Sequence, residues 1–318
     1  MQESQSSTDD KGTGVVSSNV HEEPSPVGKG RYIHMYGWMI YPKETLNNKF
    51  GNNAFGWMKE SASKNGISVD IVFSDDLFIS NANGKTEFIY MGKALSFPDF
   101  VIMRDYNYTI SIQLENLGIR VVNSTLSMFN SRNKAVTAQL LAKNKVTTPK
   151  YLFSKEKNYE FINNYFGKKK FVMKENEGSQ GKGVYLIENE EDYNNVYKTS
   201  QEYFYQEYIE FSYGRDIRAY VLGDRILGCV KRISDTSFKS NYSLGGRVEK
   251  YEMSDTIKKL SLKAAKAIGL DFCGVDLLFT KNSFTVCEVN GNAGFRTITQ
   301  VSDIDIPMEL FKWIKESL

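Results

Sequence analysis

The sequence of 318 residues contains only two histidines, His21 and His34, and both lie in or beside a polar N-terminal stretch. Beyond His34 the chain has no imidazole at all. This absence argues against a Ser-His-Asp or Cys-His nucleophile and against a histidine-ligated zinc site. Any chemistry must therefore use carboxylates, lysines, arginines, backbone amides and a hard metal ion.

Cysteines are also few, and the three present, Cys229, Cys273 and Cys287, lie in apolar runs typical of strands. They show neither metal-ligand spacing nor a disulfide pattern, so we interpret them as buried thiols and expect a reducing, cytoplasmic location. The apolar runs are too short to cross a bilayer, which predicts no membrane association. A net charge of +2 provides no general basic field, so nucleic acid is not an expected partner.

The composition otherwise fits a folded protein, with 41% hydrophobic and 13% aromatic residues. Residues 1–33 have the composition of a disordered tail. Strands alternating with helices over 34–123 predict a small, largely parallel α/β domain that binds substrate. We expect a central α+β subdomain at 124–204, beginning with one helix from Ser124 to Asn144, and a C-terminal subdomain rich in antiparallel strands at 205–318.

The stretch from Phe272 to Asn290 predicts two apolar strands joined by a tight turn. Asp276 and Glu288 lie at similar distances from that turn, so they are expected to be neighbours across the hairpin. Asn290 lies two residues beyond Glu288 and therefore points to the same face. Two carboxylates and an amide oxygen suit Mg²⁺ shared with phosphates. The alternative is an ordinary hairpin with a charged solvent face.

A glycine-rich loop, Glu177-Gly-Ser-Gln-Gly-Lys-Gly183, joins a strand ending near Lys174 to a strand beginning at Val184. Its backbone can approach an anion closely, which makes Ser179, Gln180, Gly181 and Gly183 candidate phosphate contacts. The loop is neither a Walker A motif nor a G-x-G-x-x-G motif. A purely structural hairpin loop remains the alternative.

Two further stretches place charged groups on strands. Glu207, in Gln206-Glu-Tyr-Ile209, is a candidate acceptor for an adenine amino group, or an exposed strand glutamate. Asp216 and Arg218 share one face of a strand, and Arg232 ends the next strand. A row of guanidinium groups suggests recognition of carboxylate or phosphate, and a solvated face balanced by acids is the alternative.

The order of these motifs resembles the ATP-grasp superfamily, and specifically its RimK-type glutamate ligases. The resemblance covers about residues 36–318 and is tightest over 130–294. It is carried by Lys-x5-Leu-Leu-Ala, Lys-x3-Gly-x-Gln-Gly-x-Gly-Val, Gln-Glu-Tyr-Ile, Asp-Ile-Arg, Phe-Lys-Ser-Asn and Gly-Val-Asp followed by Glu-Val-Asn. The chain departs from the pattern at Gly291–Arg296, where ribosomal-protein-modifying members typically read Ala-Ser-Pro-Gly-Leu.

The resemblance implies an ATP-grasp fold in which ATP lies between two α+β subdomains. It implies nucleotide contacts from Lys134, Lys174, the glycine loop, Glu207, Tyr208, Ile209, Asp216, Lys239, Ser240 and Asn241. It also implies that Asp276, Glu288 and Asn290 hold two Mg²⁺ or Mn²⁺ ions.

The expected function is an ATP-dependent ligase that converts a carboxylate to an acylphosphate and joins it to an amine, glutamate or a similar amino acid being favoured. Arg218 and Arg232, with Asn290, are the expected catalytic residues, and Arg218, Arg232 and Arg296 the expected substrate-binding residues. The carboxylate belongs to a peptide, a protein or a small molecule, and a homo-oligomer is possible. Alternatives are a ligase that crosslinks side chains of a ribosomal precursor peptide, a kinase and a non-catalytic ATP-binding module.

Overall fold

A four-stranded parallel sheet begins the described part of the chain. In the computed structural model, residues 34–47, 51–82, 84–153, 158–178, 181–240 and 245–318 are described. The sheet has the order β2 (Ile67–Phe73), β1 (Met35–Tyr41), β6 (Phe100–Met103) and β7 (Arg120–Val122). All its pairings are parallel, as the alternation of strands and helices predicted.

The helices of this region are η1 (Lys43–Asn47), α1 (Gly51–Lys64), η2 (Ser74–Asp76) and α2 (Tyr108–Asn116). A separate antiparallel sheet contains β3 (Leu77–Ala82), β4 (Lys85–Tyr90) and β5 (Lys93–Ala94). The first two of these strands are the predicted hairpin, although Asn83 in its turn lies outside the described residues. The two-residue strand β5 was not predicted.

The predicted helix from Ser124 to Asn144 is wrong as a single element, because the structure divides it into α3 (Thr125–Arg132) and α4 (Lys134–Lys143). Asn133 separates them with an extended backbone, and its Oδ1 accepts a hydrogen bond from the amide of Val136 at 3.0 Å. Asparagine competes well for this helix-capping role, so a new helix begins here.

The central sheet is antiparallel and has the order β10 (Val184–Ile187), β9 (Phe171–Glu175), β11 (Tyr203–Glu207) and β8 (Tyr151–Phe153). Helices α5 (Tyr159–Tyr165) and α6 (Glu190–Val196) accompany it. The predicted border between residues 204 and 205 falls inside β11. That strand pairs with β9 over its full length, so the central sheet extends to Glu207.

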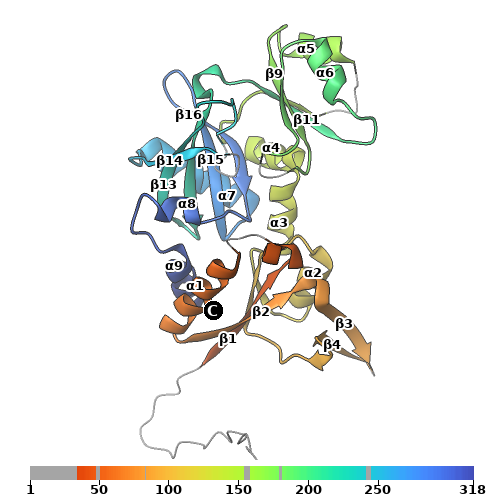
Figure 1. Cartoon of the computed structure of the whole chain (residues 1–318), viewed down its shortest axis with the longest axis vertical. Helices are drawn as coiled ribbons and strands as arrows, with labels where there is room; N and C mark the ends of the chain where they lie inside the picture. The colour runs from red at the N-terminus through yellow and green to blue at the C-terminus, as the bar shows by residue number, and fades with distance from the viewer. Residues whose placement is uncertain (1–33, 48–50, 83, 154–157, 179–180, 241–244) are drawn as a thin grey trace, which may run out of the picture. The chain divides into compact units, whose positions relative to one another are not determined.

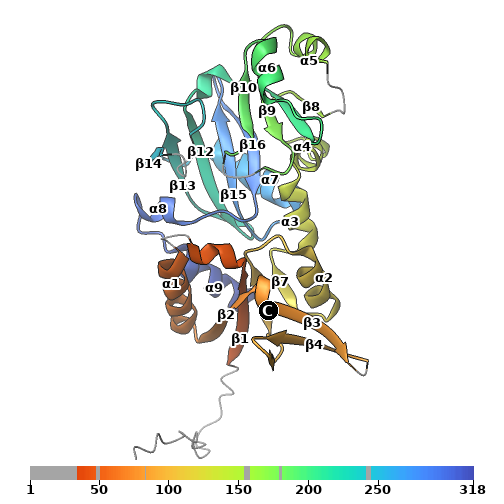
Figure 2. The ribbon, with the colours of Figure 1, turned by 45° about the vertical axis from the view of Figure 1, so that its right-hand side comes forward.

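The third sheet has five antiparallel strands in the order β14 (Arg247–Lys250), β13 (Arg225–Ile233), β12 (Arg215–Leu222), β15 (Phe272–Phe279) and β16 (Phe284–Asn290). The amphipathic helix α7 (Asp255–Ile268) packs across one face of this sheet (Figures 1 and 2). The short helix η3 (Glu210–Ser212) precedes β12. Strand β14 lies within a stretch that the sequence did not mark as a strand.

Helices α8 (Arg296–Thr299) and α9 (Ile306–Ser317) complete the chain. Although α9 is last in sequence, it contacts the N-terminal helix α1: Trp57 donates to Asp305 at 3.2 Å, and Lys315 donates to the carbonyl of Asn65 at 2.9 Å. Buried side chains of both regions share one core. No helix within the described residues is long and apolar enough to cross a membrane.

Candidate functional site

The five-stranded sheet has one apolar face and one polar face. Ile217, Ala219 and Val221 of β12 belong to the core beneath α7, and so do Val275 and Leu277 of β15. Because side chains alternate along a strand, the residues between them point to the opposite face. That face carries Asp216 and Arg218 of β12, Asp276 of β15, and Glu288 and Asn290 of β16.

The hairpin β15–β16 brings the predicted metal ligands together. Asp276 pairs directly with Glu288, and Gly274 pairs with Asn290. The predicted proximity of the two carboxylates is therefore confirmed. An irregularity in the ladder follows Asp276, so that Leu277 pairs with Val286 and Cys287 is the extra residue. This bulge lets Val286 and Val289 reach the core while Glu288 keeps the polar face.

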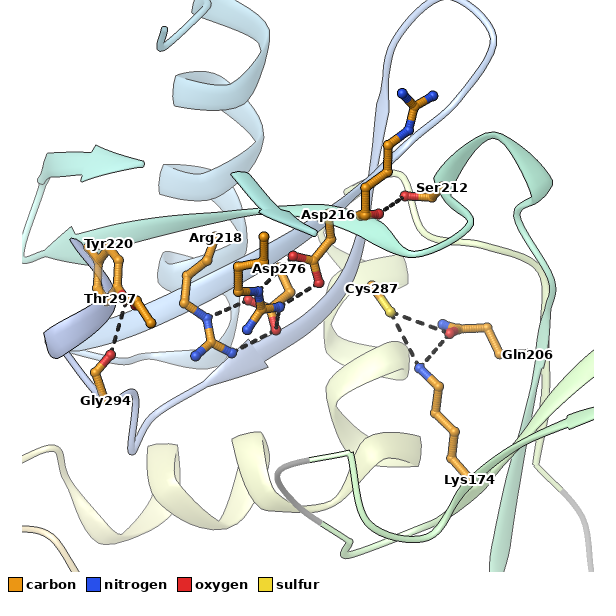
Figure 3. A network of polar contacts seen from close by, with 12 residues as sticks. Lys174, Gln206, Ser212, Asp216, Arg218, Tyr220, Asp276, Cys287, Gly294 and Thr297 are labelled. Atoms are coloured by element: carbon orange, nitrogen blue, oxygen red, sulfur yellow. Dashed lines mark hydrogen bonds and ion pairs between the residues drawn. The ribbon is translucent and has the colours of Figure 1, made fainter. Parts of the chain in front are cut away.

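Asp216, Arg218, Arg232 and Asp276 form a continuous ion-paired row. Figure 3 shows the labelled Asp216, Arg218 and Asp276 side by side. Arg218 donates to both oxygens of Asp276, at 2.7 and 2.8 Å. Arg232 donates to both oxygens of Asp216, at 2.7 and 2.5 Å, and lies 2.8 Å from the nearer oxygen of Asp276. Two guanidinium groups thus meet two carboxylates, and the row carries no net charge.

Burial makes this row electrostatically strong, because only 3% of the Arg232 side chain and 6% of the Asp276 side chain are exposed. Desolvation by itself raises the pKa of Asp276, but Arg218 and Arg232 outweigh it and hold that pKa below its ordinary value. The pKa of Arg232 is lowered by burial and raised more strongly by Asp216 and Asp276, so the net shift is upward. These shifts favour the charged forms of Arg232 and Asp276.

An open cleft, about 810 Å³ with the solvent at its mouth included, adjoins this row. Most of the predicted nucleotide-contacting residues line it, namely Lys134, Lys174, Gly181, Glu207, Tyr208, Ile209, Asp216, Lys239 and Ser240. Three predicted residues of the other classes line it too: Arg232, Asp276 and Glu288. A cleft with convergent polar groups beside apolar surface is typical of a small-molecule site.

Four predicted residues, Gly183, Arg218, Asn290 and Arg296, are not part of the cleft lining. Gly183 has a φ of +66°, and a Cβ there would lie 2.4 Å from the side chain of Glu175, so the backbone itself requires glycine. The Oδ1 of Asn290 accepts a hydrogen bond from the amide of Asn292 at 2.9 Å. Ser179, Gln180 and Asn241 lie outside the described residues.

Four lysines line the cleft, Lys134, Lys174, Lys182 and Lys239, and three of them were predicted to contact the nucleotide. Lys134 at the start of α4 donates to the carbonyl of Gly178 at 2.6 Å. Lys174 of β9 is 6% exposed and donates to Gln206 at 2.7 Å. Lys239 lies 3.2 Å from the carbonyls of Gly181 and Val184. Burial lowers the pKa of Lys134, and Glu288 partly offsets this effect.

The last residue of β11, Glu207, and the two residues that follow it line the cleft. The Oε2 of Glu207 accepts a hydrogen bond from the amide of Lys150 at 3.1 Å, and the side chain is exposed. The ring of Tyr208 packs edge-on to Phe238, with centroids 6.4 Å apart. Phe238 also lines the cleft, so aromatic surface borders it beside the end of β11.

Sequence reasoning missed two groups that hold Lys174 in place. Figure 3 shows Gln206 and Cys287 converging on its amine, with Cys287 Sγ at 3.4 Å. Gln206 is 4% exposed and follows three buried aromatic residues of the same strand, Tyr203 to Tyr205. That aromatic run was the available signal, because a polar residue that continues a buried strand needs a hydrogen-bond partner.

The sequence profile described as a RimK-like ATP-grasp domain matches residues 131–314. The chain belongs to the RimK-like ATP-grasp family. It is 31% identical over 271 residues to a probable alpha-L-glutamate ligase of Trichodesmium erythraeum, which covers 81% of the chain and 91% of that relative. It is 32% identical over 267 residues to N-acetylaspartylglutamate synthase A of Mus musculus, covering 78% of the chain and 70% of the relative.

Solved structures of ATP-grasp ligases share the fold. One is the ligase PsnB complexed with a phosphomimetic variant of its minimal precursor, Mg and ADP, at a TM-score of 0.66 and 18% identity, covering 89% of this chain and 99% of that one. Another is D-alanine–D-alanine ligase of Bacillus anthracis complexed with ATP, at a TM-score of 0.63 and 18% identity, covering 89% and 96%. The predicted fold class and the predicted ATP-grasp ligase are confirmed, and ligases of this superfamily use ATP.

Proposed function

We propose that the chain joins a carboxylate to the amine of glutamate or a similar amino acid, with ATP bound in the cleft. The observation that supports this most directly is the meeting of four lysines with the carboxylates of Asp276 and Glu288 around one cleft. The relatives named above as an alpha-L-glutamate ligase and an N-acetylaspartylglutamate synthase favour glutamate as the amine. ATP supplies the phosphoryl group that activates the carboxylate as an acylphosphate.

The donor set of the hairpin fits Mg²⁺. Within the described residues, no group of three or more His, Cys, Asp or Glu side chains gathers as a complete metal cage. Asp276 and Glu288 with the amide oxygen of Asn290 would supply a few oxygen ligands, which is the usual protein share when phosphates and waters complete the shell. Within the described residues the side chain of Glu288 forms no hydrogen bond or ion pair, so its carboxylate is available to a cation. We propose two Mg²⁺ or Mn²⁺ ions at this position.

The roles of the protein groups follow from their charge and position. Lys134, Lys174 and Lys239 would neutralise the phosphates in the cleft. The ring of Tyr208 and the backbone at Ile209 would border the adenine. The polar row of Asp216, Arg232 and Asp276 lies beside the same space, where negative charge develops when the phosphoryl group moves.

The central experiment is product analysis with defined substrates. Purified protein is incubated with Mg·ATP, L-glutamate and either N-acetyl-L-aspartate or short peptides, while ADP release is followed and products are weighed by mass spectrometry. We expect ADP and a product heavier than the acceptor by one or more glutamate residues. A peptide product lighter by one water would instead identify an internal crosslink. ADP release without any amide product would contradict the proposal.

Lys174→Met is expected to weaken Mg·ATP binding by about ten- to a hundredfold, the range for one hydrogen bond to a charged group. Methionine keeps most of the side-chain volume, so packing around β9 is retained. Binding is measured by calorimetric titration, and Lys169→Met, an exposed lysine before the same strand, is the matched control. Equal affinity in the two variants would remove Lys174 from the nucleotide site.

A further inference from the structure

Two arginines that the proposed mechanism does not use lie near the hairpin without an acidic partner. Arg104 directly follows β6, at the carboxyl edge of the parallel sheet, and Arg132 ends α3. Within the described residues, neither guanidinium lies within the 4.0 Å ion-pairing distance of a carboxylate. Asp105, next to Arg104, is instead bound to Ser74 at 2.5 Å and to the amide of Tyr106.

Arg104 is tied to the loop that follows the proposed metal ligands. It donates to the carbonyl of Ala293 at 3.0 Å, and its own carbonyl accepts a hydrogen bond from the side chain of Asn292 at 3.1 Å. The amide of Asn292 in turn donates to Asn290. The guanidinium carbon lies 5.9 Å from the ring centroid of Phe295. These contacts place Arg104 beside the end of β16.

Arg132, the last residue of α3, lies beside Tyr106. Its guanidinium carbon stands 4.5 Å from the ring centroid of Tyr106. Burial raises the pKa of the Tyr106 hydroxyl, while Arg132 and Arg104 oppose that rise and Glu288 adds to it. All three charges are therefore close enough to act on one hydroxyl. The chain neighbours of Arg132, Ser131 and Lys134, line cavities together with Glu288.

Burying the charge of Arg104 without an acidic partner costs free energy, and a bound anion would offset that cost. Burial lowers the pKa of Arg104, because its charge is desolvated and no counter-ion compensates. A desolvated guanidinium is costly unless it is paired. Arg218 and Arg232, by contrast, are already neutralised by Asp276 and Asp216. Within the described residues, Arg104 and Arg132 thus carry positive charge without a carboxylate partner, in contrast to Arg218 and Arg232.

We propose that Arg104 and Arg132 bind a non-reacting carboxylate of a substrate, beside Glu288. This inference rests on the proposed ligase function and adds the group that selects anionic substrates. A guanidinium recognises a carboxylate through paired hydrogen bonds, and Tyr106, whose ring lies under Arg132, would contribute a third donor through its hydroxyl. The carboxylate belongs either to the amino acid that provides the amine or to the molecule that is extended, and kinetics can separate the two sources.

The test compares acids with amides in the wild type and in Arg132→Gln. The probes are L-glutamate, its two monoamides, and N-acetyl-L-aspartate. Arg132→Gln should raise the KM for one carboxylate substrate by about ten- to a hundredfold, the range for a lost charge-assisted hydrogen bond. The KM for ATP should stay unchanged. Arg132→Gln should also discriminate less than the wild type between that acid and its amide. A shift confined to L-glutamate assigns the site to the amine donor, and a shift confined to N-acetyl-L-aspartate assigns it to the acceptor.

Arg104→Lys is the second variant, because it keeps the charge and the contact with the loop but loses bidentate geometry. Arg104→Lys should raise the KM for the same carboxylate substrate as Arg132→Gln does. Arg247→Gln, which removes an exposed arginine of β14, is the control and should change no KM. An equal ratio of acid to amide KM in wild type, Arg132→Gln and Arg104→Lys would overturn the proposal.

Calorimetric binding of L-glutamate and N-acetyl-L-aspartate in the presence of Mg·ADP separates this site from the proposed function. If the wild type forms no amide product, the proposed function fails. Binding that Arg132→Gln loses and Arg247→Gln keeps would still support the carboxylate site. Absence of binding to the wild type, or equal binding in both variants, would overturn it.

Discussion

Replacing Glu288 by glutamine is expected to lower turnover by about a thousandfold, since metal stabilisation of a moving phosphoryl group is worth several kcal/mol. The glutamine side chain would retain the shape of glutamate and one ligand oxygen, but it would lack the negative charge that holds the cation. The fold should be unaffected, because within the described structure Glu288 makes no hydrogen bond or ion pair that the change would break. Turnover is measured by ADP release over a range of Mg²⁺ concentrations.

The control for this variant is Glu252→Gln, which removes an exposed carboxylate from the segment before α7. It should keep wild-type turnover. Glu288→Asp retains the charge on a shorter side chain. Its turnover should lie between those of Glu288→Gln and Glu252→Gln, with partial recovery at high Mg²⁺. The midpoint temperatures of thermal unfolding should be alike for all these variants. Wild-type turnover of Glu288→Gln at limiting Mg²⁺ would remove this residue from the metal site.

The hairpin could be predicted from the sequence because its information is local. Asp276 and Glu288 are separated from the same turn by similar numbers of apolar residues, and the period of a strand determines which side chains share a face. The bulge at Cys287 could not be predicted, since it depends on how Val286 and Val289 meet the core beneath α7. The bulge nevertheless leaves Glu288 opposite Asp276 and on the polar face of the sheet, as predicted.

The ion-pair partners of Arg218 and Arg232 could not be predicted from the sequence, although both arginines were predicted to lie in the site. The register of β12 against β13 and β15 brings Asp216 opposite Arg232 and Asp276 opposite Arg218. The β12–β13 pairing is a hairpin with a bulge in its ladder, and the β12–β15 pairing joins strands far apart in the chain. Arg104 was missed for a related reason. Its strand was predicted correctly, but only the assembled structure shows that the neighbouring Asp105 turns away from it.

Removal of Arg232 is expected to destabilise the protein strongly, whatever it does to substrate binding. Arg232→Gln would leave Asp216 buried without a cation and Asp276 with only Arg218. Breaking a buried pair in this way costs about 3–5 kcal/mol. The exposed Arg247, paired with Asp235 and Glu249, provides the matched control, because Arg247→Gln should cost less than about 1 kcal/mol. Free energies of unfolding are measured by urea titration.

The pH dependence of stability gives this prediction a second readout. The pKa of Asp276 in the folded protein is below its ordinary value of 3.8. Its contribution to stability is therefore fully present above that value and is lost as the pH falls through the lower folded-state pKa. Arg232→Gln removes one of the two cations that lower this pKa, so the acid-dependent loss should be smaller than in the wild type and should be complete at a higher pH. Asp216→Asn combined with Arg232→Gln should recover part of the stability, because no unpaired Asp216 charge is left buried. A loss in Arg232→Gln no larger than that in Arg247→Gln, with the same acid profile as the wild type, would show that the row does not stabilise the fold.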